Sequence, residues 1–565
     1  MKIRVRHVLL SLSIACNGAA FAQASSTGGH SGHGSMPMPM PPAAAPNALF
    51  SEDTVAVPAV VPTSEVVLND GESFVLRAAP AKQDIGGQWI RRLAYNGSVP
   101  GPIFRVKQGS TVYVSLKNDT EVETTLHPHG LRLDSRFDGV PGVGQSPIAP
   151  GGSFDYELTF PDAGVYWYHP HIREDYTQDA GLYGVFIVEP SDSKTYNMVH
   201  REIPVVLDDI LVDPNQAFQK EVVTHTLMGR FGNVNLVNGT VQPNFNVSVG
   251  EVVRFYVLNS SNTRVFAFSI PGVQLKVVGG DNGLLEKEEW ATQVILGPGE
   301  RTIVEASFTK AGVNSITNAK PKNPAKLAKI TVTLGQVALL PTQFNVLRQN
   351  TVASSEISKV RALFAKRVDK KLKLTLSMDM GDMGGMEMPG MNMGSGSMPG
   401  MNMGSGSMPG MDMGHGSMNM PGMDMGTSAD PTAGIEWDDD MADMNSASTN
   451  KTVTWKLVDE ATGKENMDVK WLLKKGSYVK IRLFNDPKSM HPMQHPIHFH
   501  GQRFLVSSIN GKVPANLGWK DTVLIPSGST YEILLEASNP GSWMAHCHIS
   551  EHMEAGMMFG FDVAE

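Results

Sequence analysis

Near its carboxyl terminus the chain reads His546-Cys547-His548-Ile549-Ser550-Glu551-His552-Met553-Glu554-Ala555-Gly556-Met557, and this stretch decides how the fold is interpreted. It combines three histidines, one cysteine and a late methionine. Thiolate, imidazole and a distant thioether are the ligand types of a blue-copper site. Trp543 and Met544, just before this stretch, indicate a strand, in which neighbouring side chains face opposite sides. Cys547 would therefore face one metal while His546 and His548 face others, so that this short segment connects them for electron transfer.

Three further histidine motifs accompany this stretch. They are His127-Pro128-His129, His169-Pro170-His171 and His495-Pro496-Ile497-His498-Phe499-His500. In an extended segment, both histidines of a His-x-His pair lie on one face, which suits adjacent or bridging metals. The four motifs hold ten of the chain's 17 histidines. A single pair is most simply a surface loop, but four pairs, one of them built around a cysteine, favour a metal centre.

A repeated segment indicates three similar β domains. It runs from a glycine to an asparagine at 109–118, 250–259 and 476–485. A histidine motif follows the first and third copies but not the second. The metal ligands are therefore expected on the first and third domains, with a metal cluster at their interface and the middle domain as a spacer. The expected domains are residues 47–192, 193–342 and 343–565.

The four motifs, in this order, resemble those of the multicopper oxidases, and the resemblance covers nearly the whole mature chain. It implies an all-β fold of three cupredoxin-like Greek-key β-barrels. It also implies four copper ions, namely one type 1, one type 2 and a binuclear type 3 pair. The implied type 1 ligands are His495, Cys547, His552 and the axial Met557. The implied type 2 ligands are His127 and His498, and the implied type 3 ligands are His129, His169, His171, His500, His546 and His548.

The same resemblance implies an enzyme that couples one-electron oxidation of a substrate to the four-electron reduction of O₂ to water. Asp138 matches the family's acid beside the metal cluster, although a turn aspartate before glycine is the alternative from the residues alone. Met493 matches the methionine that cuprous oxidases place near the type 1 copper, and ordinary packing is its alternative. A second acid often follows the last type 1 histidine directly. Met553 stands there instead, which leaves the second proton relay open.

A Met-rich insert at 377–450 points to the substrate. The unit Met-Pro-Gly-Met-Asn-Met-Gly-Ser-Gly-Ser occurs at 388–397 and 398–407, and 378–425 holds 17 of the chain's 32 methionines. So much glycine, proline and serine predicts a disordered segment. A thioether is a soft ligand that selects Cu(I), whereas an ordinary linker is the alternative. We expect Cu(I) oxidation for copper detoxification, with a laccase-like oxidase of phenols or aromatic amines and a copper-sequestering protein as alternatives.

The amino terminus and the composition predict an exported protein. Residues 1–22 have the basic, apolar and Ala-x-Ala pattern of a secretory signal peptide, and 23–46 form a flexible Met/His leader. Removing the signal leaves Cys547 as the only cysteine, while a lipid on Cys16 is left open. The formal net charge of −9 argues against a nucleic-acid partner, and no apolar run reaches the roughly 20 residues that span a bilayer. We expect a periplasmic monomer, with secretion as the alternative.

Overall fold

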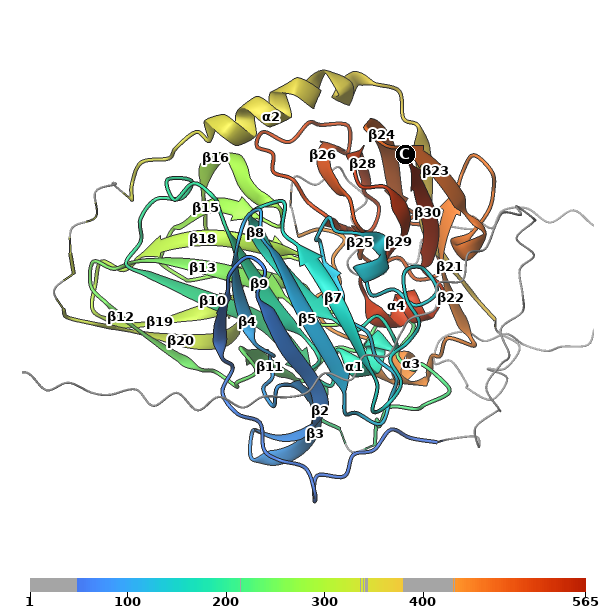
Figure 1. Cartoon of the computed structure of the whole chain (residues 1–565), viewed down its shortest axis with the longest axis horizontal. Helices are drawn as coiled ribbons and strands as arrows, with labels where there is room; N and C mark the ends of the chain where they lie inside the picture. Colours follow the sequence, from blue (N-terminus) through green and yellow to red (C-terminus); the bar gives the residue numbers. More distant parts are fainter. Residues whose placement is uncertain are drawn as a thin grey trace, which may run out of the picture. The chain divides into compact units, whose positions relative to one another are not determined.

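The computed structural model describes residues 48–565 apart from 214, 336, 339, 341–343, 380–429 and 431. The predicted signal peptide, the predicted leader and the Met-rich repeats lie outside the described residues. Pro46–Glu565 form one compact unit. Its strands form six sheets, which follow one another along the chain as three pairs (Figure 1). The prediction of an all-β chain of three barrels is confirmed.

The first barrel carries two of the histidine motifs. Its strands are β1 (Glu65–Leu68), β2 (Ser73–Ile85), β3 (Gln88–Tyr95), β4 (Ile103–Lys107), β5 (Thr111–Asn118), β6 (His127–His129), β7 (Ser153–Thr159), β8 (Gly164–His169) and β9 (Gly184–Glu189). They form sheets in the orders β1-β4-β9-β8-β6 and β3-β2-β5-β7. Along β5, Val112, Val114 and Leu116 are buried while Tyr113 and Lys117 are exposed, the alternation of a half-buried strand. Two short helices, η1 (Ser135–Phe137) and α1 (Glu174–Thr177), follow β6 and β8.

The second barrel carries none of the four motifs. Its strands are β10 (Arg201–Ile210), β11 (Val234–Val237), β12 (Asn244–Ser248), β13 (Val252–Asn259), β14 (Phe266–Ser269), β15 (Leu275–Gly280), β16 (Gly283–Ala291), β17 (Gln293–Leu296), β18 (Arg301–Ser307), β19 (Gly312–Asn318) and β20 (Ala325–Thr333). They form sheets in the orders β11-β10-β13-β18-β15-β16 and β12-β20-β19-β14-β17. β13 and all but the last residue of β18 are buried, which shows that this sheet is covered on both faces.

The third barrel carries the other two motifs on neighbouring strands. Its strands are β21 (Lys370–Met378), β22 (Val453–Asp459), β23 (Lys470–Lys474), β24 (Ser477–Asn485), β25 (His495–Phe499), β26 (Arg503–Ile509), β27 (Thr522–Ile525), β28 (Thr530–Ala537), β29 (Gly541–Cys547) and β30 (Met558–Ala564). They form sheets in the orders β22-β21-β24-β28-β26 and β23-β30-β29-β25-β27. The short helices η3 (Asn466–Asp468) and α4 (Ser550–Glu554) complete it, and α4 follows β29 directly.

A helix between the second and third barrels was not predicted. α2 (Thr351–Arg361) continues into η2 (Ala362–Ala365) and lies against β16 (Figure 1). Asn350 caps it, because its side chain accepts hydrogen bonds from the backbone N–H groups of the next turn. Ile357 and Val360 are buried against Trp519 of the third barrel. Only Ala353, Ile357 and Val360 of this helix are buried, so the sequence shows only a weak helical spacing of apolar residues.

The prediction that disorder extends from 377 to 450 is wrong at its ends. Met378 is the last residue of β21, and residues 432–450 are folded around α3 (Ala442–Ala447). The buried Asn445 side chain of α3 donates to Gly229 O at 2.8 Å and accepts from Met228 N–H at 3.0 Å. These partners lie more than 200 positions away along the chain, so the local composition gave no sign of them.

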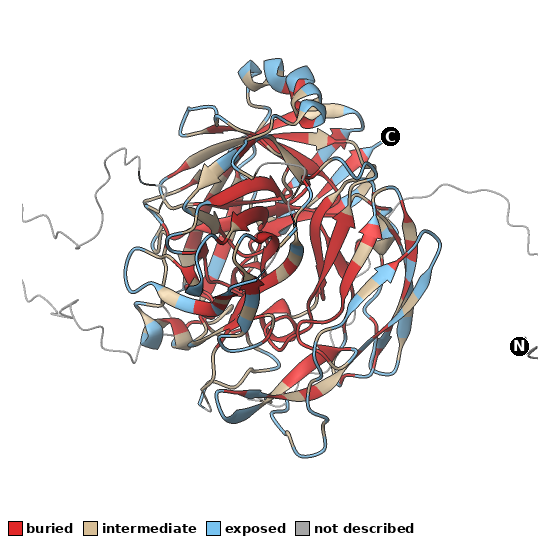
Figure 2. Ribbon diagram, turned by 90° about the vertical axis from the view of Figure 1, so that its left-hand side faces the viewer, coloured by how far each residue is buried: buried red, intermediate tan, exposed pale blue. Residues whose placement is uncertain are grey.

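Burial is concentrated on the central strands (Figure 2). β25, β6 and β8 are buried along their whole length, so the histidine motifs lie inside the protein rather than on surface loops. Among the described residues, no helix combines the length and the apolar character that a membrane span requires.

Candidate metal centre

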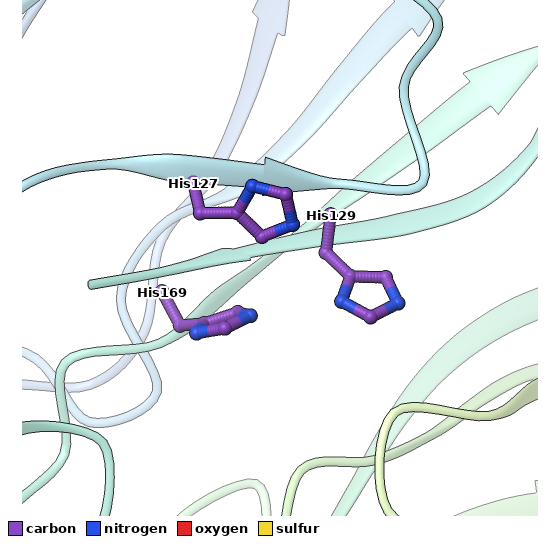
Figure 3. Close-up of side chains that lie close together, drawn as sticks. All are labelled: His127, His129 and His169. Carbon is purple, nitrogen blue, oxygen red and sulfur yellow. The ribbon is translucent and has the colours of Figure 1, made fainter. Parts of the chain in front are cut away.

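The histidine motifs of each barrel lie on paired strands. In the first barrel His127 pairs with His169, and in the third His498 pairs with His546. Figure 3 shows the rings of His127, His129 and His169 gathered beside the strands that carry them. The two barrels then meet ring to ring. The centroids of His127 and His500 lie 4.1 Å apart and those of His129 and His498 3.7 Å apart.

Eight histidines form this cluster, and all of them are buried. They are His127, His129, His169, His171, His498, His500, His546 and His548. Several groups of three have ring nitrogens within 4.8 Å of one another, such as His127, His498 and His500, or His171, His500 and His546. Burial and the neighbouring rings lower the pKa of His498 well below its ordinary value. Burial also lowers the pKa of His500 to about 4, although Asp138 raises it. The rings of His498 and His500 are therefore neutral, which is the form that binds copper.

In several of these rings one nitrogen has no hydrogen-bond partner in the described part of the chain, whereas Nε2 of His546 and Nε2 of His500 lie 2.9 Å from each other. His127 Nδ1 lies 2.7 Å from Asp138 O, His169 Nδ1 2.8 Å from Pro170 O, and His546 Nδ1 2.9 Å from Cys547 O. The opposite nitrogens, Nε2 of His127 and Nε2 of His169, have no hydrogen-bond partner among the described residues, nor does Nε2 of His171. Buried polar atoms normally have partners, and metal-binding histidines use the second nitrogen for an outer hydrogen bond. The donor set therefore fits bound metal.

A second, smaller group contains the cysteine. The Sγ atom of Cys547 lies 3.6 Å from His495 Nδ1 and 3.8 Å from His552 Nδ1, and the two nitrogens lie 3.3 Å apart. The indole of Trp455 stacks on His552 at 4.2 Å. Burial raises the pKa of the Cys547 thiol well above its ordinary value, so a cation is needed to form the thiolate. Met557 is buried in the same cluster of side chains, and its backbone carbonyl accepts from Cys547 N–H at 3.0 Å.

The two groups are joined through three successive residues. Cys547 faces His495, whereas the rings on either side of it, His546 and His548, face the eight-histidine cluster. Ile497 pairs with Cys547 on the neighbouring strand, which holds the segment in register. The cysteine is therefore covalently linked to a histidine of the cluster on each side.

Asp138 lies between histidines of two barrels. Its carboxylate is 2.8 Å from His500 Nδ1 and 3.4 Å from His127 Nδ1, and it is almost fully buried. Burial alone would raise the pKa of Asp138, but His500 and His127 hold it well below its ordinary value. The carboxylate is thus an acceptor that orients both rings. The Cβ that Gly139 lacks would strike the backbone of Leu126, which explains the glycine that follows.

Other groups near the histidines were not anticipated. Glu174, at the start of α1, has carboxylate oxygens 3.3 Å from His171 Nδ1 and 3.8 Å from His169 Nδ1. Burial raises the pKa of Glu174 well above its ordinary value. Glu174 and Asp175 follow the His169-Pro170-His171 motif by a few positions, and this local pattern could have pointed to Glu174. Asp521 and Arg301 also approach the cluster, but they lie 220 positions apart and gave no local signal. Arg301 belongs to the second barrel, so this barrel, which was expected to act as a spacer, also contributes a side chain that bonds to Asp521.

Several methionines belong to, or pack against, the apolar core cluster of the third barrel, which also contains Cys547. Met493 is fully buried in the same cluster of side chains as Cys547. Met441 and Met444 of the α3 region pack against that cluster. The residue between Met493 and His495, Gln494, accepts from Glu436 N–H at 2.7 Å and so ties the α3 segment to this strand.

Comparisons with known proteins agree on one family. Two family models described as multicopper oxidase match residues 83–193 and 435–565. Copper resistance protein A homolog of Pseudomonas syringae pv. tomato is 25% identical over 555 residues, which cover 86% of this chain and 91% of that protein. Laccase-3 of Oryza sativa subsp. japonica is 24% identical over 539 residues, which cover 87% and 92%.

Solved structures extend the match to the fold. The crystal structure of a multi-copper oxidase from Pseudomonas thermotolerans is 25% identical, with a TM-score of 0.62 over 88% of this chain and 100% of that one. The three-barrel fold is therefore that of three cupredoxin-like domains. The chain belongs to the multicopper oxidase family, and it is a copper-dependent oxidoreductase that uses O₂ as its electron acceptor.

Proposed function

We propose that this oxidase acts on Cu(I), as an exported, monomeric enzyme of copper detoxification that holds four copper ions. The proposed type 1 ligands are His495, Cys547, His552 and the axial Met557. The proposed type 2 ligands are His127 and His498, and the proposed type 3 ligands are His129, His169, His171, His500, His546 and His548. Bound copper would supply one-electron oxidation of the substrate and reduction of O₂ to water.

The free ring nitrogens support this ligand assignment. Each histidine of the cluster is buried, and several of them hold one nitrogen in an outer hydrogen bond while the other has no partner in the described part of the chain. Such a pattern costs free energy without a metal, since an unpaired buried polar atom loses its hydration. The Cys547 thiol is also buried, beside two histidines. Reactive cysteines are usually partly exposed, so this burial favours a metal ligand over a free nucleophile.

The residues of the chain divide the work between two ends. Cys547 with His495 and His552 would receive electrons from the substrate. The backbone from Cys547 to its neighbouring histidines would carry them to the O₂ end. Asp138 would keep His500 and His127 in place and, as the acid nearest the cluster, would pass on protons that water formation consumes.

One observation carries the choice of Cu(I). Met493 is part of the apolar core cluster that contains Cys547, and Met441 and Met444 pack against that cluster. Thioether sulfur prefers Cu(I) among the common biological oxidation states of copper. A small ion would reach these buried or partly buried thioethers more easily than a bulky phenol would. The similarity to a copper resistance protein supports the same choice, whereas the similarity to a laccase keeps phenols as the second candidate.

Oxygen uptake tests the proposal. The purified enzyme should consume O₂ with Cu(I) at micromolar concentrations and should use a phenol less efficiently. Replacing Met441 and Met444 together by leucine should raise the KM for Cu(I) and leave phenol oxidation equal or faster. The control is Met198→Leu, a change at an exposed methionine of the segment between the first and second barrels. A protein that binds Cu(I) without consuming O₂ would instead be a sequestering protein, and a preference for phenols would favour a laccase.

A further inference from the structure

A buried arginine of the second barrel bonds to both barrels that carry the histidines. Arg301 Nε donates to Val165 O of the first barrel at 2.7 Å. Its Nη1 and Nη2 atoms donate to the two carboxylate oxygens of Asp521 in the third barrel, each at 2.6 Å. All of these groups are buried. Two parallel bonds between guanidinium and carboxylate fix the orientation of both groups more firmly than a single charge contact.

Asp521 and its neighbour in turn contact two histidines of the cluster. Asp521 Oδ1 lies 3.1 Å and Thr522 Oγ1 2.9 Å from His129 Nε2. His498 Nδ1 lies 2.9 Å from Asp521 O and 3.1 Å from Thr522 Oγ1. The rings of His129 and His498, which come from different barrels, stack at 3.7 Å and 17°. One short segment of the third barrel therefore positions both rings.

This contact decides which nitrogen of His129 is free. A carboxylate that is paired with an arginine accepts hydrogen bonds, so His129 must carry its proton on Nε2. The lone pair then lies on Nδ1, the atom that has no partner among the described residues. His498 is held through Nδ1, and its free atom is Nε2. The outer hydrogen bonds thus aim a different nitrogen of each ring into the cluster.

The turn before Arg301 touches the cluster as well. Arg301 Nη1 donates to Gly299 O at 3.0 Å, so the arginine also holds this turn. Gly299 has a φ of +79°, and a Cβ added there would lie 3.0 Å from the His548 ring and 3.4 Å from that of His129. A side chain at this position would therefore press on histidines from both barrels.

Further charged residues, Asp281, Glu300 and Lys520, lie next to the arginine and its backbone. Lys520 Nζ lies 2.9 Å from Asp281 and 3.2 Å from Glu300, and Asp281 accepts from Arg301 N–H at 2.8 Å. Burial alone would lower the pKa of Arg301, but Asp281 and Asp521 raise it above its ordinary value. The guanidinium is therefore held charged by groups of the second and third barrels.

From these contacts we infer that Arg301 is a positioning residue for the O₂-reducing end, acting through Asp521 on His129 and His498. The inference rests on the proposed ligand assignment for these two histidines. It gives the second barrel, which holds none of the proposed ligands, a direct part in the geometry of the metal cluster.

Replacement of the arginine tests the inference. Arg301→Met should lose at least one copper ion per chain and the type 2 signal in electron paramagnetic resonance, while the blue absorption of the Cys547 site remains. Arg301→Lys keeps the charge but not the parallel bonds, so it should keep the copper and show a shifted type 2 spectrum. The matched control is Arg254→Met, which removes a buried arginine paired with Glu305 inside the same barrel. It should lower the thermal midpoint of the apo protein without changing either spectrum.

The possible outcomes distinguish a failure of the role of Arg301 from a failure of the proposed ligand assignment. Wild-type copper content with an unchanged type 2 spectrum in Arg301→Lys and Arg301→Met would overturn the role of Arg301 alone. If Arg301→Met does not fold, an unchanged type 2 spectrum in Arg301→Lys is sufficient to overturn it. A wild-type protein that binds copper without any type 2 signal would overturn the ligand assignment, and the inference with it.

Discussion

The Nδ1 atom of His500 lies 2.8 Å from the carboxylate of Asp138, although 362 positions separate the two residues along the chain. One residue comes from the third barrel and the other from the first. The family resemblance predicted Asp138 beside the metal cluster, but no local pattern predicted that its carboxylate would contact a histidine of the third barrel. The interface between the two barrels is thus the place where substitutions are most informative.

Asp138→Asn should slow the reduction of O₂ by about 10²-fold, the lower end of the range for loss of a general acid or base. An amide neither delivers protons nor accepts two histidine N–H groups as a carboxylate does. Electron entry at Cys547 should stay fast, since it needs no proton from this site. Stopped-flow measurement of each half-reaction checks this expectation. Equal slowing of reduction by substrate and reoxidation by O₂ would argue against the proposed role.

Cys547→Ser should abolish the blue colour and the oxidase activity together. A serine hydroxyl does not replace a thiolate as a strong, soft copper ligand. The eight-histidine cluster should still bind copper, because Cys547 Sγ contacts the other histidine group. Visible absorption and copper content per chain measure both effects. A variant that stayed blue would refute the assignment of Cys547 to the type 1 site.

His169→Ala should keep the blue colour that Cys547→Ser loses. The ring of His169 lies 5.3 Å from that of His127 and 5.2 Å from that of His548, inside the O₂ end. Its removal should leave the blue colour largely intact while turnover with O₂ is lost. Reduction of the blue copper under anaerobic conditions serves as the internal control. Retained turnover would exclude a cluster shared between the first and third barrels.

Asn445→Ala should destabilise the folded protein by about 1–3 kcal/mol for each buried partner left without a hydrogen bond. Asn445 is buried and bonds to Met228 N–H and Gly229 O. Ser446→Ala is the control, because the Ser446 hydroxyl donates to Asp443 O within the same helix. Chemical denaturation of the apo proteins measures the difference. Equal stability of the two variants would mean that α3 is not anchored through Asn445.

Deletion of 380–429 should raise the KM for Cu(I) and leave the blue spectrum unchanged. Many weak thioether sites tethered to the third barrel raise the local Cu(I) concentration, as linked binding modules do. The structure sets the limits of the deletion, because β21 ends at Met378 and residues 432–450 are folded. Phenol oxidation should be equal or faster. Unchanged Cu(I) kinetics across the micromolar range would make this segment an ordinary linker.

The fold and most of the candidate site were predictable because their signals are local. The His-x-His pairs and the repeated strand segment lie within a few residues each, so one sequence is enough to recognise them. Arg301 and Asp521 were not predictable, since a salt bridge across 220 positions leaves no pattern in either segment. The folded part at 432–450 was missed for the same reason. Its folding depends on the backbone of Met228 and Gly229, and nothing within 432–450 itself reveals these partners.

The alternation of side chains around Cys547 has a consequence for how this gene can vary. Because β29 places Cys547 toward one group of ligands and the adjacent histidines toward another, a single added or deleted codon here would exchange the two faces. Both metal groups would lose ligands in one event, and no later substitution at one position would restore them. Homologous genes should therefore tolerate point changes around this strand while excluding length changes within it.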